Sequence, residues 1–272
     1  MRYTPLSSSI YKRNRRNFMD QMKGNSMAVF NSNDIYPVSA DSELPFEQHR
    51  DIFHLTGIDQ EETILLLYPP SKNEKTREIL FIRKSDDHTK VWEGEKLSKE
   101  KATNLSGIEN IYFVEEFKKI LNSIAVKVDT FYINKNEHYR ANSPVETRED
   151  RFITWLLKNY PAHNVAKSNP ILQRQRSIKH PDEIDQIKIA CDITMKGFNR
   201  VLKFIKPNVW EYEIEAEFIH EFINNSSKGF AYSPIIASGC DNNVLHYIKN
   251  NKKCKSGELI LMDVGAEYGN YS

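Results

Sequence analysis

Long hydrophobic runs are absent from this chain of 272 residues. The longest, such as Ile64 to Tyr68, fall far short of the roughly 20 apolar residues that a helix needs to cross a bilayer. The first residues, Met1 to Pro5, also lack the apolar segment of a secretory signal peptide. We therefore expect a cytoplasmic protein that makes no membrane contact.

Cysteine is scarce. The chain has three cysteines, Cys191, Cys240 and Cys254, and their spacing is not that of a metal-binding motif. An odd number of widely spaced cysteines argues against a disulfide framework and fits a reducing cytosol. We interpret them as small buried or half-buried residues.

Neither sign of charge is in excess, because 38 Lys and Arg residues face 37 Asp and Glu residues and the formal net charge is +1. This balance gives no electrostatic argument for binding nucleic acid or a membrane surface. A local basic cluster, Lys12 to Arg16, lies in a predicted helix over Ser8–Met22. We interpret it as a solvated helix face or an intersubunit contact, and no nucleic-acid partner is expected.

What the chain does contain is a mixture of strand and helix signals in its first part, which predicts an α/β domain. Helices are expected at Glu115–Ile124 and Thr147–Asn159. Strands are expected at Met27–Phe30, Ile52–Leu55, Thr63–Tyr68, Ile79–Ile82, Ile111–Phe113 and Phe131–Ile133.

The composition of the sequence changes between Asn159 and Pro181, where prolines bracket polar and basic residues. Because proline disfavours regular structure at its own position and at the preceding one, we place a domain boundary here. The predicted domains are residues 1–172 and residues 173–272. Pro181 suits the first turn of a helix that opens the second domain.

A second helix is predicted from Glu211 to Asn225, followed by strands at Ser233–Ser238, Val244–Tyr247 and Leu259–Asp263. The glutamates of this helix could be considered as metal ligands, but their spacing distributes them over several sides of the helix. We therefore expect a solvated face that comprises Glu211, Glu213, Glu215, Glu217 and Glu221.

The apolar run Leu259–Met262 ends in Asp263, and four consecutive apolar residues indicate a strand buried on both faces. A carboxylate at the end of such a strand is costly to desolvate unless a cation, such as a metal ion, binds it.

The segment Tyr268-Gly-Asn270 predicts a tight turn. Centred between Tyr268 and Gly269, this turn would place Asp263 opposite position 274, where a second carboxylate could share a metal pair. A turn centred on Gly269-Asn270 would weaken that argument.

Taken alone, Tyr232, His246 and Asp263 are weak signals, since a lone His is usually structural and a lone Asp usually caps a turn. Together with their surroundings, Asn243–Tyr247 and Lys255–Tyr271 resemble aminopeptidase P, the Xaa-Pro aminopeptidase. That family belongs to the pita-bread metallopeptidases, with prolidase and methionine aminopeptidase. The resemblance covers nearly the whole chain, including Asp41–Gln48, Asp51–Gly57, Val91–Gly94 and His180–Ile184, where Ser is more usual than His180.

The resemblance implies a fold and a set of site residues. The fold is an α/β N-terminal domain of the creatinase/prolidase type, followed by the first part of an α+β pita-bread catalytic domain. Asp263 matches the first metal-bridging aspartate, His246 a catalytic histidine that binds substrate, and Tyr232 a tyrosine that supports the metal site. The family has five ligands, and the remaining Asp, His and two Glu, with the general base, are expected after Ser272.

The activity implied by the resemblance is metal-assisted hydrolysis. Two divalent metal ions, usually manganese in this family, lower the pKa of a water molecule. The substrates are peptides with proline in second position, from which the N-terminal residue is released. The resemblance also implies a homo-oligomer, either a dimer or a tetramer. We expect the 272 residues by themselves to be inactive.

Two alternatives stay open at this point. One is prolidase, which cleaves Xaa-Pro dipeptides, and the region Asp51–Gly57 favours aminopeptidase P over it. The other is a non-catalytic peptidase-like binding module, because a fold alone confers no activity. The joint presence of Tyr232, His246 and Asp263 favours the enzyme.

Overall fold

The computed structural model describes residues 2–135 and 144–272, and the chain divides into two compact units. One unit is Leu6–Ile178, and the other joins residues 2–5 to Lys179–Ser272. The boundary expected between residues 172 and 173 lies within helix α7 (Asn169–Ser177).

The described part of the Leu6–Ile178 unit is built on a six-stranded mixed sheet with the strand order β6-β5-β4-β1-β7-β8. β4 pairs antiparallel with β1 and β5, and the outer pairs are parallel. The strands are β1 (Ser26–Asn31), β4 (Ile64–Leu67), β5 (Glu78–Ile82), β6 (Asn110–Phe113), β7 (Thr130–Ile133) and β8 (Asn164–Lys167). A small separate hairpin is formed by β2 (Pro37–Ser39) and β3 (Ser42–Glu43).

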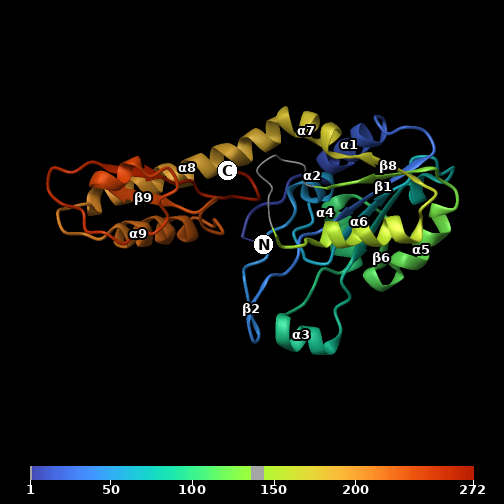
Figure 1. The fold of residues 1–272 in the computed structure, drawn as a ribbon, viewed down its shortest axis with the longest axis horizontal. Coiled ribbons are helices and arrows are strands. Elements are labelled where there is room, and N and C mark those ends of the chain that lie inside the picture. The colour runs from blue at the N-terminus through green and yellow to red at the C-terminus, as the bar shows by residue number, and fades with distance from the viewer. Residues whose placement is uncertain (1, 136–143) are drawn as a thin grey trace. The chain divides into compact units, whose positions relative to one another are not determined.

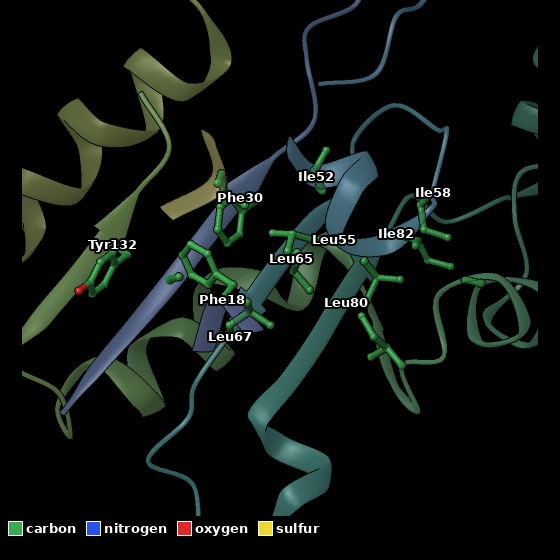
Figure 2. Packing of buried hydrophobic residues seen from close by; sticks show 14 of the residues in the cluster. Phe18, Phe30, Ile52, Leu55, Ile58, Leu65, Leu67, Leu80, Ile82 and Tyr132 are labelled. Atoms are coloured by element: carbon green, nitrogen blue, oxygen red, sulfur yellow. The ribbon is translucent and has the colours of Figure 1, made fainter. Parts of the chain in front are cut away.

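Helices cover both faces of this sheet (Figure 1). Alternate strand residues point to opposite faces, so Phe30 and Leu65 pack against α1, α2, α4 and α7 on one face (Figure 2). Val29 and Leu66 pack against α5 and α6 on the other face. The three layers confirm the expected α/β domain. The helices are α1 (Ser8–Met19), α2 (Arg50–Thr56), α3 (Asp87–Glu93), α4 (Lys99–Ser106), α5 (Phe117–Ala125), α6 (Arg148–Asn159) and α7 (Asn169–Ser177).

One predicted strand of this unit is wrong, because Ile52–Leu55 lies in helix α2. Local capping explains the difference: His49 Nδ1 accepts a hydrogen bond from the Asp51 N–H, and Gly57 ends the helix in the left-handed region, at φ 69°. The helix is buried all round, so its apolar run carries no helical period. The other five predicted strands are confirmed to within one residue at each end.

The segment between Asn159 and Pro181, expected to be irregular, is also regular in part. It contains β8 and α7. Pro170 lies in the first turn of α7, where its missing N–H has no helical partner to lose. Proline there starts a helix and does not interrupt one.

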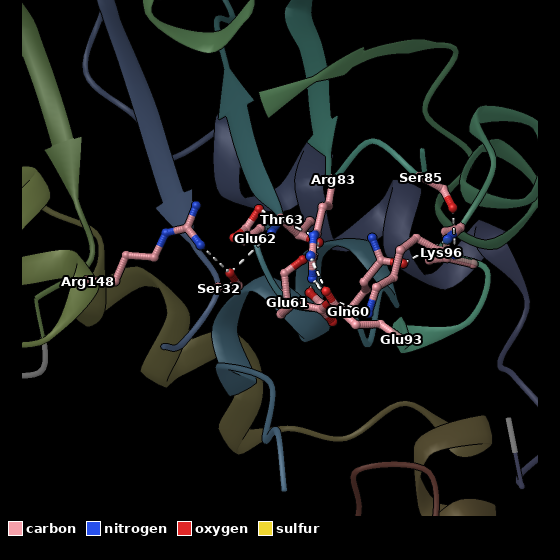
Figure 3. A network of polar contacts seen from close by, with 11 residues as sticks. Ser32, Gln60, Glu61, Glu62, Thr63, Arg83, Ser85, Glu93, Lys96 and Arg148 are labelled. Atoms are coloured by element: carbon pink, nitrogen blue, oxygen red, sulfur yellow. Dashed lines mark hydrogen bonds and ion pairs between the residues drawn. The ribbon is translucent and has the colours of Figure 1, made fainter. Parts of the chain in front are cut away.

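A network of ion pairs holds the segment after α3 to the ends of β4 and β5 (Figure 3). The Arg83 guanidinium donates two hydrogen bonds to Glu93, both at 2.6 Å, and one to Glu61 at 3.0 Å. The Lys96 ammonium lies 2.6 Å from Glu61. The hydrogen bonds from Arg83 are the main cause that lowers the pKa of Glu93 to about 2.

The second unit packs α8 (Pro181–Phe204) against α9 (Glu211–Asn224) and against a two-stranded sheet of β9 (Ile235–Ser238) and β10 (Ile260–Asp263). α8 begins as expected, with Pro181 in its first turn. His180 is its N-cap, and its backbone N–H donates to Glu183 at 2.7 Å. The core is apolar and comprises Ile193, Val201, Ile214, Phe218, Phe222 and Ile236, with further residues around it.

Two expectations for this unit are wrong. Val244–Tyr247 forms no strand, and β10 is not buried on both faces. In the part of the chain that the structure describes, β10 pairs with β9 alone, and the side chains of Leu259 and Leu261 are 80% and 41% exposed. Asp263 is exposed as well, so its carboxylate keeps contact with solvent and does not need a cation to offset a cost of desolvation.

Candidate metal centre

Asp263 and Tyr232 meet at the end of β10. The Tyr232 hydroxyl donates a hydrogen bond of 2.7 Å to Asp263 Oδ1. Backbone pairing beyond β10 brings the two segments together, because the Ala231 N–H donates to the Gly265 carbonyl at 2.8 Å. The two residues, 31 apart in sequence, are therefore joined by strand pairing as well as by the side-chain contact.

Gly265 makes room for the tyrosine ring. A Cβ atom at this position would lie 3.3 Å from Tyr232 Cε1 and 3.4 Å from its hydroxyl oxygen. The first distance is tighter than most such contacts and the second is at the lower limit of ordinary van der Waals contact, so a side chain at position 265 would require the ring to shift by a few tenths of an ångström. The absence of a side chain thus allows the ring to lie against the backbone and to reach Asp263.

The environment keeps the Tyr232 hydroxyl protonated. Desolvation, the hydrogen bond to Asp263 and the charge of that carboxylate raise the pKa of Tyr232 to about 12. The hydroxyl is therefore a hydrogen-bond donor throughout the physiological pH range. No side-chain hydrogen bond or ion pair other than this one is found for Asp263 among the described residues, which leaves Oδ2 available.

The side chains present fit one part of a metal site. Carboxylate oxygens are the ligands that hard divalent cations prefer, and Asp263 offers one held in place by Tyr232. Residues 2–135 and 144–272 contain no group of three or more His, Cys, Asp or Glu side chains that could hold a metal ion. Asp263 thus stands as a single ligand within the described chain.

Among the described residues, no hydrogen bond connects His246 with Tyr232 or Asp263. His246 is exposed, and no hydrogen bond is found for it among the described residues. It follows the short 3₁₀ turn Gly239–Asn243, which continues from β9, and it precedes Tyr247, which is buried. The structure therefore brings Tyr232 and Asp263 into contact and leaves His246 on a neighbouring turn.

The tight turn near the end of the described chain is centred on Gly269-Asn270. The Tyr268 and Tyr271 backbones exchange hydrogen bonds of 2.8 and 3.0 Å, and the two central residues have φ angles of 60° and 67°. Both central positions of such a turn need positive φ, which Gly and Asn adopt far more readily than Tyr. Of the two turn centres considered, the structure thus has the one on Gly269-Asn270, which weakens the argument that Asp263 lies opposite a carboxylate at position 274.

Sequence reasoning also missed a buried carboxylate. Glu211, expected on a solvated face, is fully buried and accepts hydrogen bonds from Ser238, Tyr247 and Lys252. A signal existed, because Glu211 shares the spacing of the apolar stripe formed by Ile214 and Phe218. The other four glutamates are at least partly exposed, as expected.

Comparison with protein families assigns both units. Residues 11–132 match the aminopeptidase P N-terminal domain, and residues 185–272 match the metallopeptidase family M24. The chain thus carries an N-terminal domain of the aminopeptidase P type, followed by part of a domain of family M24. Tyr232, His246 and Asp263 all lie in the M24 segment. This confirms the expected family and the expected order of an α/β domain followed by part of a pita-bread domain.

Relatives of this chain cover it almost completely. The Xaa-Pro aminopeptidase of Escherichia coli is 27% identical over 98% of the chain, and that of Haemophilus influenzae is 29% identical over 98%. A solved structure of an Escherichia coli aminopeptidase P variant in complex with substrate has a TM-score of 0.86 at 26% identity and covers 98% of the chain. The chain spans about 60% of the length of these relatives.

Among the described residues, the helices were compared with what a membrane span requires. α8, which runs from Pro181 to Phe204, carries charged residues along its length. In the described ranges no helix is both long enough and apolar enough to span a bilayer.

Proposed function

We propose that this chain serves in a metal-dependent aminopeptidase that releases the N-terminal residue from peptides with proline in second position. The observation that carries the proposal is the hydrogen bond from Tyr232 to Asp263 within the M24 segment. The similarity to Xaa-Pro aminopeptidases over almost the whole chain supports it. Because the chain spans about 60% of those relatives, the activity is assigned to a polypeptide that also carries the remaining ligands.

Asp263 and Tyr232 take distinct roles in this proposal. Asp263 binds metal, and Tyr232 fixes the orientation of the carboxylate by holding Oδ1, which leaves Oδ2 free. The metal site holds two divalent ions, with manganese as the expected metal, and they supply an activated water at neutral pH. The raised pKa of Tyr232 keeps the supporting hydrogen bond in place at that pH.

His246 is assigned to the substrate. An exposed imidazole that is not engaged in an internal hydrogen bond can donate one to a peptide carbonyl oxygen. A proline in second position has no N–H and a fixed φ, so the site must recognise it through its shape and through carbonyl oxygens. His246 would thus contact the region of the scissile bond.

Two measurements test the proposal. Calorimetric titration of the 272-residue chain with manganese is expected to show no tight binding, and the same chain is expected not to turn over an Arg-Pro-Pro peptide, because one carboxylate cannot close a metal site. Clear turnover by these residues would show that the site lies elsewhere.

The reading frame after Ser272 gives the second test. An Asp, a His and two Glu in that order would complete the ligand set, and the longer protein should then cleave Xaa-Pro peptides in a manganese-dependent manner. Preference for Xaa-Pro dipeptides would identify a prolidase instead. Absence of those residues would favour a non-catalytic binding module.

We further propose that the protein forms a dimer or tetramer and works in the cytoplasm. The three cysteines are all free thiols, which suits a reducing compartment. Cys254 is buried as expected, but Cys191 and Cys240 are exposed, so the expectation of burial is wrong for these two. Sedimentation velocity of the purified protein would report its oligomeric state, and a monomer at all concentrations would contradict this part of the proposal.

A further inference from the structure

Glu211 is the most completely engaged buried carboxylate of the M24 segment. Its Oε1 accepts hydrogen bonds from the backbone N–H and the hydroxyl of Ser238, both at 2.7 Å. Its Oε2 accepts from the Tyr247 hydroxyl at 2.7 Å and from the Lys252 N–H at 2.9 Å. Four donors satisfy the lone pairs of both oxygens, which is the condition for keeping such a group buried.

These four donors belong to one stretch of chain. Ser238 ends β9, Tyr247 lies in the middle of the following segment, and Lys252 lies at its far end. The Glu211 backbone N–H also donates to the Lys252 carbonyl at 2.9 Å. A single residue at the start of α9 therefore binds the beginning, the middle and the end of residues 238–252.

We infer that Glu211 is a positioning residue, which fixes residues 238–252 so that the exposed His246 side chain is presented from a defined turn. The inference rests on the proposed function for the role of His246. Among the described residues no hydrogen bond is found for His246, so its place depends on its covalent neighbours. Of its two direct neighbours, Leu245 is exposed, whereas Tyr247 is buried and its hydroxyl donates to Glu211.

The same carboxylate also steadies the strand next to Asp263. β9 pairs with β10 in a register that sets Ile235 opposite Asp263 and Ser238 opposite Ile260. By holding Ser238, Glu211 fixes one end of the strand whose other end faces the metal-binding aspartate. One buried group thus connects the supports of both proposed site residues.

A plain structural role would give a different result from a positioning role. A group that merely fills the core would lower the stability of the whole unit without a specific change in residues 238–252. The matched control is Glu217, which lies on the same helix and pairs with Arg200, and for which no hydrogen bond or ion pair to that stretch is found among the described residues. A second control is Ile214→Val, which weakens the core beside Glu211 without touching the hydrogen bonds.

The first experiment measures amide hydrogen exchange in the 272-residue chain. Glu211→Gln replaces one acceptor oxygen by a donor NH₂ group, so some donors lose their partner. Amide exchange in residues 238–252 should become at least tenfold faster. In Glu217→Gln and Ile214→Val, the ratio of the exchange rate in that stretch to the exchange rate in the rest of the unit should stay unchanged. Equal exchange in Glu211→Gln and the controls would overturn the inference.

Tyr247→Phe keeps the experiment decisive if Glu211→Gln does not fold. It removes one of the four donors and retains the ring, which fills the same space. Exchange should rise around His246 and stay unchanged in β9, where Ser238 still binds Glu211. No change around His246 in this variant would also overturn the inference.

The second experiment measures turnover of an Xaa-Pro peptide by the longer protein that carries the remaining ligands. Glu211→Gln should lower kcat by roughly 10- to 100-fold with a smaller effect on KM, since a misplaced side chain loses alignment more than binding. The controls should retain kcat. If the unmodified protein shows no turnover, the proposed function fails, and the exchange data then decide alone whether Glu211 fixes this stretch.

Discussion

The hydroxyl of Tyr232 determines how the carboxylate of Asp263 is presented. By donating to Oδ1 at 2.7 Å, it fixes the plane of the carboxylate and directs Oδ2 away from the contact. Hydrogen bonds of this kind orient metal ligands, and their loss commonly costs about 10- to 100-fold in metal affinity or activity. Under the proposed function, the metal affinity of the site would thus depend on a residue that is not itself a ligand.

We predict that Tyr232→Phe lowers manganese affinity and turnover by about 10- to 100-fold in a protein with a complete metal site, because Asp263 loses its orienting donor. Stability should change little, since Tyr232 is 48% exposed. Calorimetric titration with manganese and peptide kinetics measure the effect. Tyr212→Phe is the matched control, at 49% exposure and without contact to Asp263, and an equal loss in this control would contradict the prediction.

A second prediction concerns the space under the tyrosine ring. Gly265→Ala places a Cβ atom 3.3 Å from the ring and should displace the hydroxyl from Asp263. The pKa of Tyr232, raised to about 12 in the native contact, should then fall toward its ordinary value of about 10. Absorbance titration of tyrosinate, with Tyr232→Phe to identify the signal, measures the shift.

The control for this prediction is Gly24→Ala, because a Cβ atom at Gly24 meets nothing within 4 Å. This variant should leave the Tyr232 titration unchanged. An unchanged titration in Gly265→Ala as well would show that the ring does not depend on the missing side chain.

At the scale of elements, α3 and the segment after it are held mainly by ion pairs, whereas most other elements of this unit are held mainly by apolar packing. α3 buries little apolar surface, with Val91 and Trp92 largely exposed, and the chain that follows it is held by Arg83, Glu93 and Lys96. Such partly exposed pairs contribute modestly to stability and are sensitive to protonation. This element should therefore respond to acid before the core does.

We predict that the stability difference between the parent chain and Glu93→Gln shrinks as the pH falls. The folded pKa of Glu93, about 2, lies below its usual value of 4.5, so its contribution is full above about pH 4.5 and is lost between about pH 4.5 and 2. The contribution is about 1 kcal/mol at most, because the side chain is 40% exposed. Urea unfolding at neutral pH and near pH 3 measures it.

Glu43→Gln serves as the control for the acid experiment, since Glu43 lies on the exposed strand β3 and no ion pair is found for it among the described residues. Its effect should not depend on pH. A difference for Glu93→Gln that stays constant down to pH 3 would show that the network is not a source of acid sensitivity.

Regular elements with a clear period were predictable from the sequence, and the exceptions have physical causes. The β1 and β4 segments are buried runs between turn residues, and both were found. The α2 segment was assigned to a strand because its apolar run is buried all round, and only its caps, His49 and Gly57, indicated a helix.

The candidate site was predictable only in part. The sequence pattern selected Tyr232 and Asp263, but their contact depends on the pairing of residues 229–231 with residues 265–267, a long-range register that no local pattern specifies. The burial of Glu211 was missed because charge was given more weight than its position in the apolar stripe of α9.

At the scale of the whole molecule, the two units differ in the size of their apolar cores. The Leu6–Ile178 unit has an extensive apolar cluster on each face of its sheet. In its described residues, the Lys179–Ser272 unit has one smaller cluster and a sheet of two strands. Two-stranded sheets are marginal without further support, so stability should be unequally divided between the units.

We predict that residues 6–178 fold when expressed alone, because both faces of their sheet are covered by their own helices. Circular dichroism and urea unfolding should show a cooperative transition like that of a single domain. Residues 179–272 alone should show weaker protection of their amides from exchange. A non-cooperative transition for residues 6–178 would contradict this division.

The free edge of β10 has a consequence for how residues 1–272 behave in solution as an isolated polypeptide. Its outward backbone groups have no strand partner in the described ranges, and Leu259 and Leu261 project beside them. Such an edge can act as a template on which an identical segment of another molecule adds in register, the first step toward cross-β fibrils. Prolonged storage of concentrated samples would thus favour turbidity and thioflavin-positive deposits that nucleate at residues 259–263.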